Sequence, residues 1–205
     1  RIPATTLRRL WTMLAHHQGE LLDQSKLAAA LAISGQTVSR YIDLLCDLML
    51  VRRLPAWHGN VGKRLIRSPK VYVRDSGLVH ALLGLSNLDA VLSHPVAGSS
   101  WEGFVIEQLI NAAPQAQASF YRTSNGAEVD LVLTFRNQQT WTIEIKRSSA
   151  PTVSKGFYQA ATDLGAVRKL LVAPVEHTYP MKEGIEVMDV MTAIHLVTQQ
   201  DQHNG

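Results

Sequence analysis

The chain has 205 residues, 46% hydrophobic and 18% charged, which is long and apolar enough for one large or two small domains and excludes a disordered protein. The longest apolar runs are far shorter than the roughly 20 residues of a transmembrane helix, and a single cysteine excludes an intrachain disulfide, so we expect a cytoplasmic protein without membrane contact. The net charge of +3 divides unevenly: residues 1–75 hold 12 Lys and Arg against 5 Asp and Glu (+7), and the remainder holds 8 against 12 (−4). This asymmetry predicts two modules, of which the first suits an anionic partner such as DNA.

The first 50 residues predict three helices. Apolar residues three and four positions apart predict a helix over 6–17, a short second helix capped by Ser25, and a third capped by Ser34. A short helix, a tight turn and a longer helix is the order of a helix-turn-helix. The polar side of the third helix is expected to contact nucleic acid through four side chains: Gln36, Thr37, Ser39 and Arg40.

Two basic strands are predicted next, over 51–54 and 70–74, joined by a loop with Pro55, Gly59 and Gly62. A basic ribbon behind a helix-turn-helix is typical of a winged helix, whose wing meets phosphates. From residue 52 to residue 74 there are seven cations and no acid, of which we expect six to bind nucleic acid: Arg52, Arg53, Lys63, Arg64, Arg67 and Lys70. Two alternatives stay open: a basic surface that is merely solvated, and a helical hairpin that packs against a partner protein.

A boundary is expected near residue 95, giving a winged-helix domain over 1–95 and a second domain over 96–205. Asp75 is expected to cap a short helix that ends at residue 83, and residues 84–98 read as the connection. The next predicted helix covers 101–113, and on a helical wheel Glu102 lies inside its apolar arc whereas Glu107 lies on the solvated side. A carboxylate on a core-facing arc is costly unless it meets a cation or a metal, so Glu102 calls for a functional explanation.

Three strands are then predicted over 119–122, 128–135 and 140–147, followed by a helix over 157–164 and a strand over 169–173. If Thr134 pairs with Thr142, then Asp130, Glu144 and Lys146 project from one face. The two carboxylates are then diagonal neighbours about 7 to 8 Å apart, a spacing that one Mg²⁺ or Mn²⁺ can bridge. A register slipped by one residue would move Asp130 to the other face, and this alternative stays open.

These residues carry a family resemblance. Asp130 followed by Glu144-Ile145-Lys146, with Glu102 on a preceding helix, resembles the PD-(D/E)xK nuclease core, with Val129 in place of the motif's proline. More narrowly, the chain resembles the C-terminal region of a family of bacterial and archaeal AAA+ ATPases. That resemblance includes the stretches 31–34, 63–78 and 101–105. It implies an α/β (α+β) fold: a winged helix-turn-helix followed by a restriction-endonuclease-like αβββαβ domain.

The resemblance also implies roles. Glu102, Asp130 and Glu144 would bind Mg²⁺ or Mn²⁺, and Lys146 would orient the attacking water and stabilise phosphate charge during cleavage of DNA. Because the chain begins at Arg1 without a leader, and its Gly59–Lys63 stretch lacks the spacing of a phosphate-binding loop, we expect the ATPase module, and with it ATP, to belong to a missing N-terminal part.

Three hypotheses follow. The first is a metal-dependent deoxyribonuclease region of a DNA-acting ATPase. The second is a catalytically inactive, nuclease-like module that binds DNA or protein and regulates the ATPase; the third and weakest is a free-standing transcriptional regulator. Oligomeric state is left open.

Overall fold

The computed structural model describes residues 3–59 and 61–203, which divide into two compact units. Unit 1 contains the described residues up to 54 together with 68–104, and unit 2 contains 55–67 and the described residues from 105 onward. Helices and two β-sheets make up the described chain, so the predicted mixed α and β class is confirmed.

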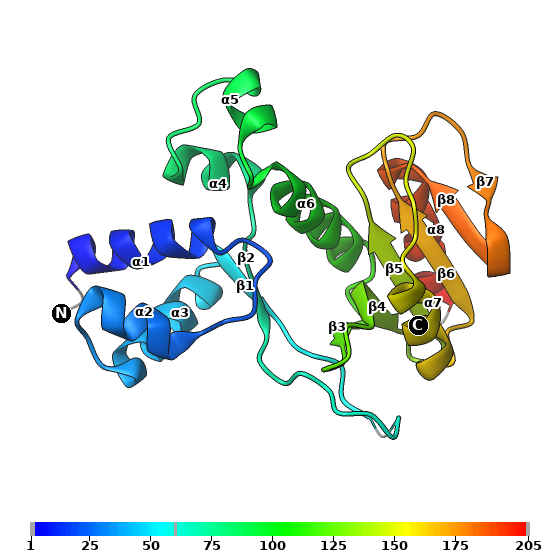
Figure 1. The fold of residues 1–205 in the computed structure, drawn as a ribbon, viewed down its shortest axis with the longest axis horizontal. Helices are drawn as coiled ribbons and strands as arrows, with labels where there is room; N and C mark the ends of the chain where they lie inside the picture. Colours follow the sequence, from blue (N-terminus) through cyan, green and yellow to red (C-terminus); the bar gives the residue numbers. More distant parts are fainter. Residues whose placement is uncertain (1–2, 60, 204–205) are drawn as a thin grey trace. The chain divides into compact units, whose positions relative to one another are not determined.

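Unit 1 begins with three helices and a two-stranded ribbon in the predicted order (Figure 1). The core of unit 1 buries Leu10 and Leu14 of α1, Ile42 and Leu45 of α3 and Val71 of β2. The elements of unit 1 that lie wholly within it are α1 (Ala4–His16), α2 (Gln24–Leu31), α3 (Gly35–Asp47), β1 (Val51–Leu54), β2 (Lys70–Val73), α4 (Ser76–Leu82) and α5 (Leu88–Ser93).

Local capping explains where these helices begin. Ser34 and Asp75 accept the backbone N–H groups of Thr37 and Leu78, as predicted. The predicted Ser25 cap is wrong, because Asp23 accepts the N–H of Lys26 at 3.0 Å and α2 starts at Gln24, two residues before the predicted Lys26. The predicted connection over 84–98 is also wrong in part, since it contains α5, capped by Asn87.

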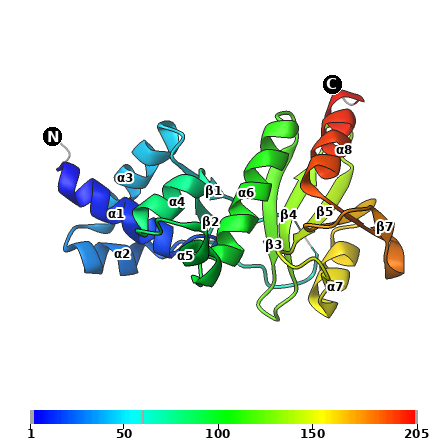
Figure 2. The same cartoon turned by 90° about the horizontal axis from the view of Figure 1, so that it is seen from above.

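Helix α6 (Ala97–Ala112) begins four residues before the predicted start, and its later half belongs to unit 2. Unit 2 holds a six-stranded sheet of order β3-β4-β5-β6-β8-β7. Figure 2 shows α7 and α8 on opposite faces of this sheet. The remaining elements are β3 (Gln117–Arg122), β4 (Glu128–Thr134), β5 (Thr140–Ile145), α7 (Lys155–Asp163), β6 (Arg168–Val172), β7 (Tyr179–Pro180), a short 3₁₀ helix (Lys182–Gly184), β8 (Ile185–Met188) and α8 (Val190–His203).

The 55–67 segment, predicted as the loop of the wing, lines the edge strand β3 of unit 2. Phe120 N donates to Pro55 O at 3.0 Å and Trp57 N donates to Phe120 O at 2.7 Å. Further along, Ile66 N donates to Arg122 O at 2.9 Å. Backbone bonds on this scale satisfy groups that an edge strand would otherwise expose, so the segment covers the sheet edge.

Candidate functional site

The hairpin of β4 and β5 brings two carboxylates directly opposite one another. The observed register pairs Thr134 with Thr140 and Leu131 with Ile143, so its next step sets Asp130 opposite Glu144. The predicted pairing of Thr134 with Thr142 is therefore wrong by two residues. Because the error is even, both acids still lie on one face of the sheet.

That face is the one covered by α7. Asp130 and Glu144 share it with Val132 and, across β6 and β8, with Leu171 and Val187. Val132, Leu171 and Val187 belong to one hydrophobic cluster with Phe157 and Ala160 of α7. The carboxylates therefore extend an apolar layer, which is a costly place for charge.

Both carboxylates are buried and have polar partners. Asp130 is 8% exposed and Glu144 5% exposed. Asp130 Oδ2 accepts the N–H of Ile145 at 2.9 Å, and Lys146 Nζ lies 2.6 Å from Glu144 Oε1. The Lys146 side chain is 38% exposed, so this cation contacts both the buried carboxylate of Glu144 and solvent. Asp130, Glu144 and Lys146 are thus brought together at one end of the hairpin.

The first turn of α7 lies near this end of the hairpin. Ser154 caps α7 by accepting the N–H of Phe157 at 3.2 Å. A Cβ placed on Gly156 would lie 3.0 Å from the carbonyl oxygen of Gly126, in the turn that precedes β4. Only glycine allows this approach without displacement of the turn, so Gly156 helps to fix α7 over the carboxylate face.

Glu102 has partners in unit 1. Its Oε1 accepts the hydroxyl of Tyr72 at 2.6 Å and lies 3.2 Å from Lys70 Nζ. Its side chain is 21% exposed, whereas that of Lys70 is 5% exposed. The buried ion pair accounts for an acid on the apolar arc of α6 without a metal, and the predicted metal role of Glu102 remains a prediction.

Sequence reasoning missed Glu107. It was expected to be solvated, yet it is only 4% exposed. Its neighbours Val105, Ile106 and Leu109 are also buried, so this part of the helix is covered on more than one side. At 100° per residue these positions span more than half of the helix circumference.

Across residues 3–59 and 61–203 no three His, Cys, Asp or Glu side chains are grouped closely enough to hold a metal ion.

The predicted nucleic-acid residues of unit 1 differ in accessibility. Gln36 and Arg40 of α3 are exposed, whereas Thr37 and Ser39 are half-buried and the Thr37 hydroxyl lies 2.8 Å from that of Ser34. On the ribbon, Arg53 pairs with Asp43 of α3. Lys70 is buried against Glu102, so its ammonium is not presented to a phosphate as the sequence analysis expected.

The three cations of the 55–67 segment also differ from one another. Lys63 Nζ contacts both carboxylate oxygens of Asp163, at 2.7 and 2.6 Å. Arg64 and Arg67 are exposed, and the carbonyl of Arg64 accepts the N–H of Ser124. These residues therefore sit on unit 2 rather than on a wing of unit 1.

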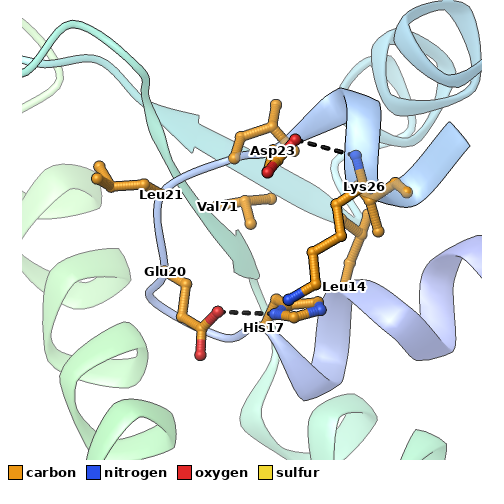
Figure 3. Close-up of a pocket in the computed structure, with 9 residues that line it drawn as sticks. Leu14, His17, Glu20, Leu21, Asp23, Lys26 and Val71 are labelled. Atoms are coloured by element: carbon orange, nitrogen blue, oxygen red, sulfur yellow. Dashed lines mark hydrogen bonds and ion pairs between the residues drawn. The ribbon is translucent and has the colours of Figure 1, made fainter. Parts of the chain in front are cut away.

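Unit 1 also contains a cavity of about 220 Å³ between the end of α1 and the start of α2 (Figure 3). Its lining includes apolar Leu14 and polar His17, Glu20 and Asp23. His17 Nδ1 lies 2.7 Å from Glu20, and Asp23 accepts a backbone N–H from α2. His17 and Glu20 are thus partners of each other, and Asp23 caps α2, so we assign the cavity no ligand.

Comparison with known proteins adds family context. Residues 1–89 match the family described as a domain of unknown function (DUF8612), and residues 97–193 match another domain of unknown function (DUF4143). An uncharacterized protein of Mycobacterium tuberculosis and one of Mycobacterium bovis are each 43% identical over 185 residues, which is 90% of this chain. The chain spans only 42% of the length of these relatives.

Among solved structures, a chain of a half-complex from a tetradecameric assembly of Thermococcus gammatolerans McrB AAA+ hexamers with bound McrC is similar, with a TM-score of 0.36 and 10% identity. The match covers 96% of this chain and 76% of that one, and it is too distant to bear on function. No helix within the described part of the chain is long and apolar enough to cross a membrane.

Proposed function

We propose that the chain is a nucleic-acid-binding and metal-dependent nuclease region that hydrolyses DNA phosphodiester bonds. The observation that carries this proposal is the pair of buried carboxylates, Asp130 and Glu144, opposite one another on adjacent strands, with Lys146 at 2.6 Å from Glu144. Like charges directly opposite on antiparallel strands repel each other. A divalent cation between them would turn this repulsion into attraction.

The donor set fits Mg²⁺ or Mn²⁺, because carboxylate oxygens are the ligands these ions prefer. Asp130 and Glu144 would hold the ion, and two carboxylates suffice because Mg²⁺ commonly keeps several waters and takes substrate phosphate oxygens as further ligands. When bound, the ion would act as a Lewis acid on the phosphate and lower the pKa of water. Lys146, half in solvent, would stabilise charge that develops on the phosphate.

Unit 1 would hold the duplex as a winged helix. The exposed side chains of Gln36 and Arg40 on α3 suit contacts in a groove, and Arg52 on β1 suits the phosphate backbone. Arg64 and Arg67 would serve the same purpose from unit 2. From the resemblance to the C-terminal region of AAA+ ATPases we also propose an AAA+ ATPase module as the partner of this chain within a longer protein. The related mycobacterial proteins are more than twice as long as the matched region, which leaves room for such a module.

The test is Mn²⁺ binding by calorimetry together with cleavage of a DNA duplex. We expect the wild-type chain to bind and cleave, and the variant Asp130→Asn/Glu144→Gln to lose both while its DNA affinity survives. Glu128→Gln is the matched control, since Glu128 lies on the same strand and face two residues before Asp130. Persistent cleavage in the double variant would overturn the assignment, and Glu107→Gln would show whether a further buried acid contributes.

A second candidate is a nuclease-shaped module without catalysis that binds DNA or protein. The ion pair between Lys146 and Glu144 favours it, because an acid that already has its own cation at 2.6 Å has less need of a metal. Wild-type protein that binds duplex DNA in a salt-sensitive manner, yet binds no Mn²⁺ and cleaves nothing, would select this candidate.

A further inference from the structure

Exposed positive charge gathers at one end of the unit 2 sheet. At this end β4 begins and β5 ends, and Asp130 and Glu144 lie close to it, so we call it the carboxylate end. Two cations of the 55–67 segment, one cation after β5 and one at the start of α7 belong to elements that reach it. These four exposed residues are Arg64, Arg67, Arg147 and Lys155.

Contacts with the β3–β4 turn bring two of these cations to the carboxylate end. Ser124, in this turn, donates its N–H to the carbonyl of Arg64 at 3.0 Å. From the other side α7 packs on the same turn, since a Cβ on Gly156 would lie 3.0 Å from Gly126 O, and Lys155 directly precedes Gly156. The backbones at Arg64 and Lys155 are therefore anchored to one turn, which leads directly into β4.

The other two cations follow the last residues of β3 and β5. Ile66 N donates to the carbonyl of Arg122, at the end of β3, and Arg67 follows Ile66. Arg147 follows the lysine whose ammonium contacts Glu144. Because β4 is antiparallel to both β3 and β5, the last residues of those two strands lie at the end where β4 begins.

The acids of unit 2 do not balance this charge. Three of them are held in ion pairs: Glu128 with Arg122, Glu186 with Arg168 and Asp163 with Lys63. In the loops at the carboxylate end, Asp189 caps α8, and Glu176 is an exposed acid. By contrast, none of the four exposed cations forms an ion pair within residues 3–59 and 61–203.

The 55–67 segment decides the sign of the charge on unit 2. Residues 105–205 hold 8 Lys and Arg against 10 Asp and Glu, a net charge of −2. The segment adds three cations and no acid, which changes the net charge of the unit to +1. A loop that the sequence assigned to the wing of unit 1 thus supplies positive charge beside the carboxylates of unit 2.

We propose that the carboxylate end of unit 2 is itself a nucleic-acid surface, on which Arg64, Arg67, Arg147 and Lys155 contact phosphates of duplex DNA around the carboxylate pair. The inference rests on the proposed function and extends it, because it adds Arg147 and Lys155 and gives unit 2 a backbone contact of its own. Duplex DNA carries one charge per about 1.7 Å of its axis, so cations spread over a surface each meet a phosphate without converging on one anion.

Lysine footprinting of the wild-type chain tests the location. The rate of acetylation at each lysine is measured by mass spectrometry with and without a short DNA duplex, in the presence of a chelator that prevents cleavage. At a duplex concentration ten times the dissociation constant, only the free protein reacts at Lys155, so its rate falls about 10-fold. Lys182 is the internal control, because it is exposed and precedes β8 at the opposite end of the sheet, and its rate should not change. Unchanged acetylation of Lys155 in the bound complex would overturn the proposal.

A pair of matched variants tests the energetics. Arg64→Gln/Lys155→Gln should reduce the slope of log Kd against log salt concentration by about 2, since each phosphate contact contributes about 0.9. Arg136→Gln/Lys182→Gln removes the same charge from exposed positions at the opposite end of the sheet and should keep the wild-type slope. Equal slopes in the two variants would refute the surface. Footprinting of the wild type remains decisive if either variant is unfolded by circular dichroism.

The footprint also separates this surface from other partners and from catalysis. Protection of Lys155 by polyglutamate at the same charge concentration as by the duplex would overturn the assignment to DNA in favour of an acidic protein. Protection by the duplex without cleavage in Mn²⁺ would leave the surface standing and remove the nuclease proposal. Cleavage with Lys155 unprotected would do the reverse.

Discussion

Asp163 of α7 secures the 55–67 segment to unit 2, and the variant Asp163→Asn measures how strongly. Its carboxylate accepts hydrogen bonds from Lys63 at 2.6 and 2.7 Å and from Tyr121 and Gln159, both at 2.9 Å. The side chain is only 9% exposed. Asparagine keeps one acceptor oxygen but turns an NH₂ group toward these donors, so the ion pair and at least one hydrogen bond are lost.

The expected cost follows from these contacts. A hydrogen bond to a charged group is worth about 1.5–3 kcal/mol, and the ionic part is discounted to below about 1 kcal/mol because the Lys63 side chain is 36% exposed. We therefore expect a loss of about 2 kcal/mol in the free energy of unfolding, measured with urea. Hydrogen exchange at the amides of Trp57 and Ile66, which bond to β3, should accelerate as well.

The pH dependence tests the reasoning. Burial raises the pKa of Asp163, but hydrogen bonds from Lys63, Gln159 and Tyr121 lower it overall. A lowered folded-state pKa means that the stabilisation is present above the unfolded value of about 3.9 and is lost as pH falls through the folded value. The difference between wild type and Asp163→Asn should thus be constant from about pH 5 to 8 and shrink in acid. A difference no larger than that of the exposed control Glu176→Gln, or one that persists undiminished in strong acid, would refute this account.

Three further predictions concern other contacts. Gly156→Ala should lower the free energy of unfolding by about 1–3 kcal/mol, because its Cβ would lie 3.0 Å from Gly126 O; unchanged urea stability would show that the turn yields freely. Tyr72→Phe should cost about 1.5–3 kcal/mol by thermal unfolding, since the buried hydroxyl donates to Glu102 at 2.6 Å, and in Glu102→Gln the same substitution should cost less. Asp189→Ala should cost about 1 kcal/mol at pH 7, because Asp189 accepts two N–H groups at the start of α8. A hydrogen bond from Thr192 lowers the pKa of Asp189 in the folded protein. The stability difference between wild type and Asp189→Ala, measured with urea, should therefore shrink as pH falls below the ordinary aspartate pKa and disappear once pH passes the lowered pKa.

Much of the fold was predictable because local signals agreed with the final packing. The caps of α3 and α4 and the alternation of β4 and β5 placed these elements within a few residues. The hairpin register was not predictable, because it depends on how tightly the connection closes. Gln138 adopts a left-handed φ of 63°, and Phe135 N donates to Gln139 O at 2.9 Å, so the turn is shorter than assumed. Alternation along each strand nevertheless kept both acids on one face.

Glu107 shows a different limit. The helical wheel orders residues correctly by angle, but it locates solvent only if a helix is covered on one side. Where Val105, Ile106 and Leu109 are all buried, no amphipathic stripe marks the remaining buried position. For Glu102, the helical wheel correctly indicated that the carboxylate needs a positively charged partner. The partner is Lys70, which the sequence had instead suggested as a nucleic-acid contact.

The seven cations between residues 52 and 74 show why counting charges along the sequence overestimates the number of residues that can contact nucleic acid. In the folded chain Arg53 pairs with Asp43, Lys63 with Asp163 and Lys70 with Glu102, each partner lying at least ten residues away in sequence. A buried ammonium such as that of Lys70 is stabilised by its acid. Binding a phosphate instead would break this ion pair and leave the carboxylate of Glu102 without its cation. Nucleic acid would therefore meet fewer cations than the sequence suggests, among them the exposed Arg40, Arg64 and Arg67. Substitution of these three should reduce the salt dependence of DNA binding, whereas substitution of Lys70 should change stability instead.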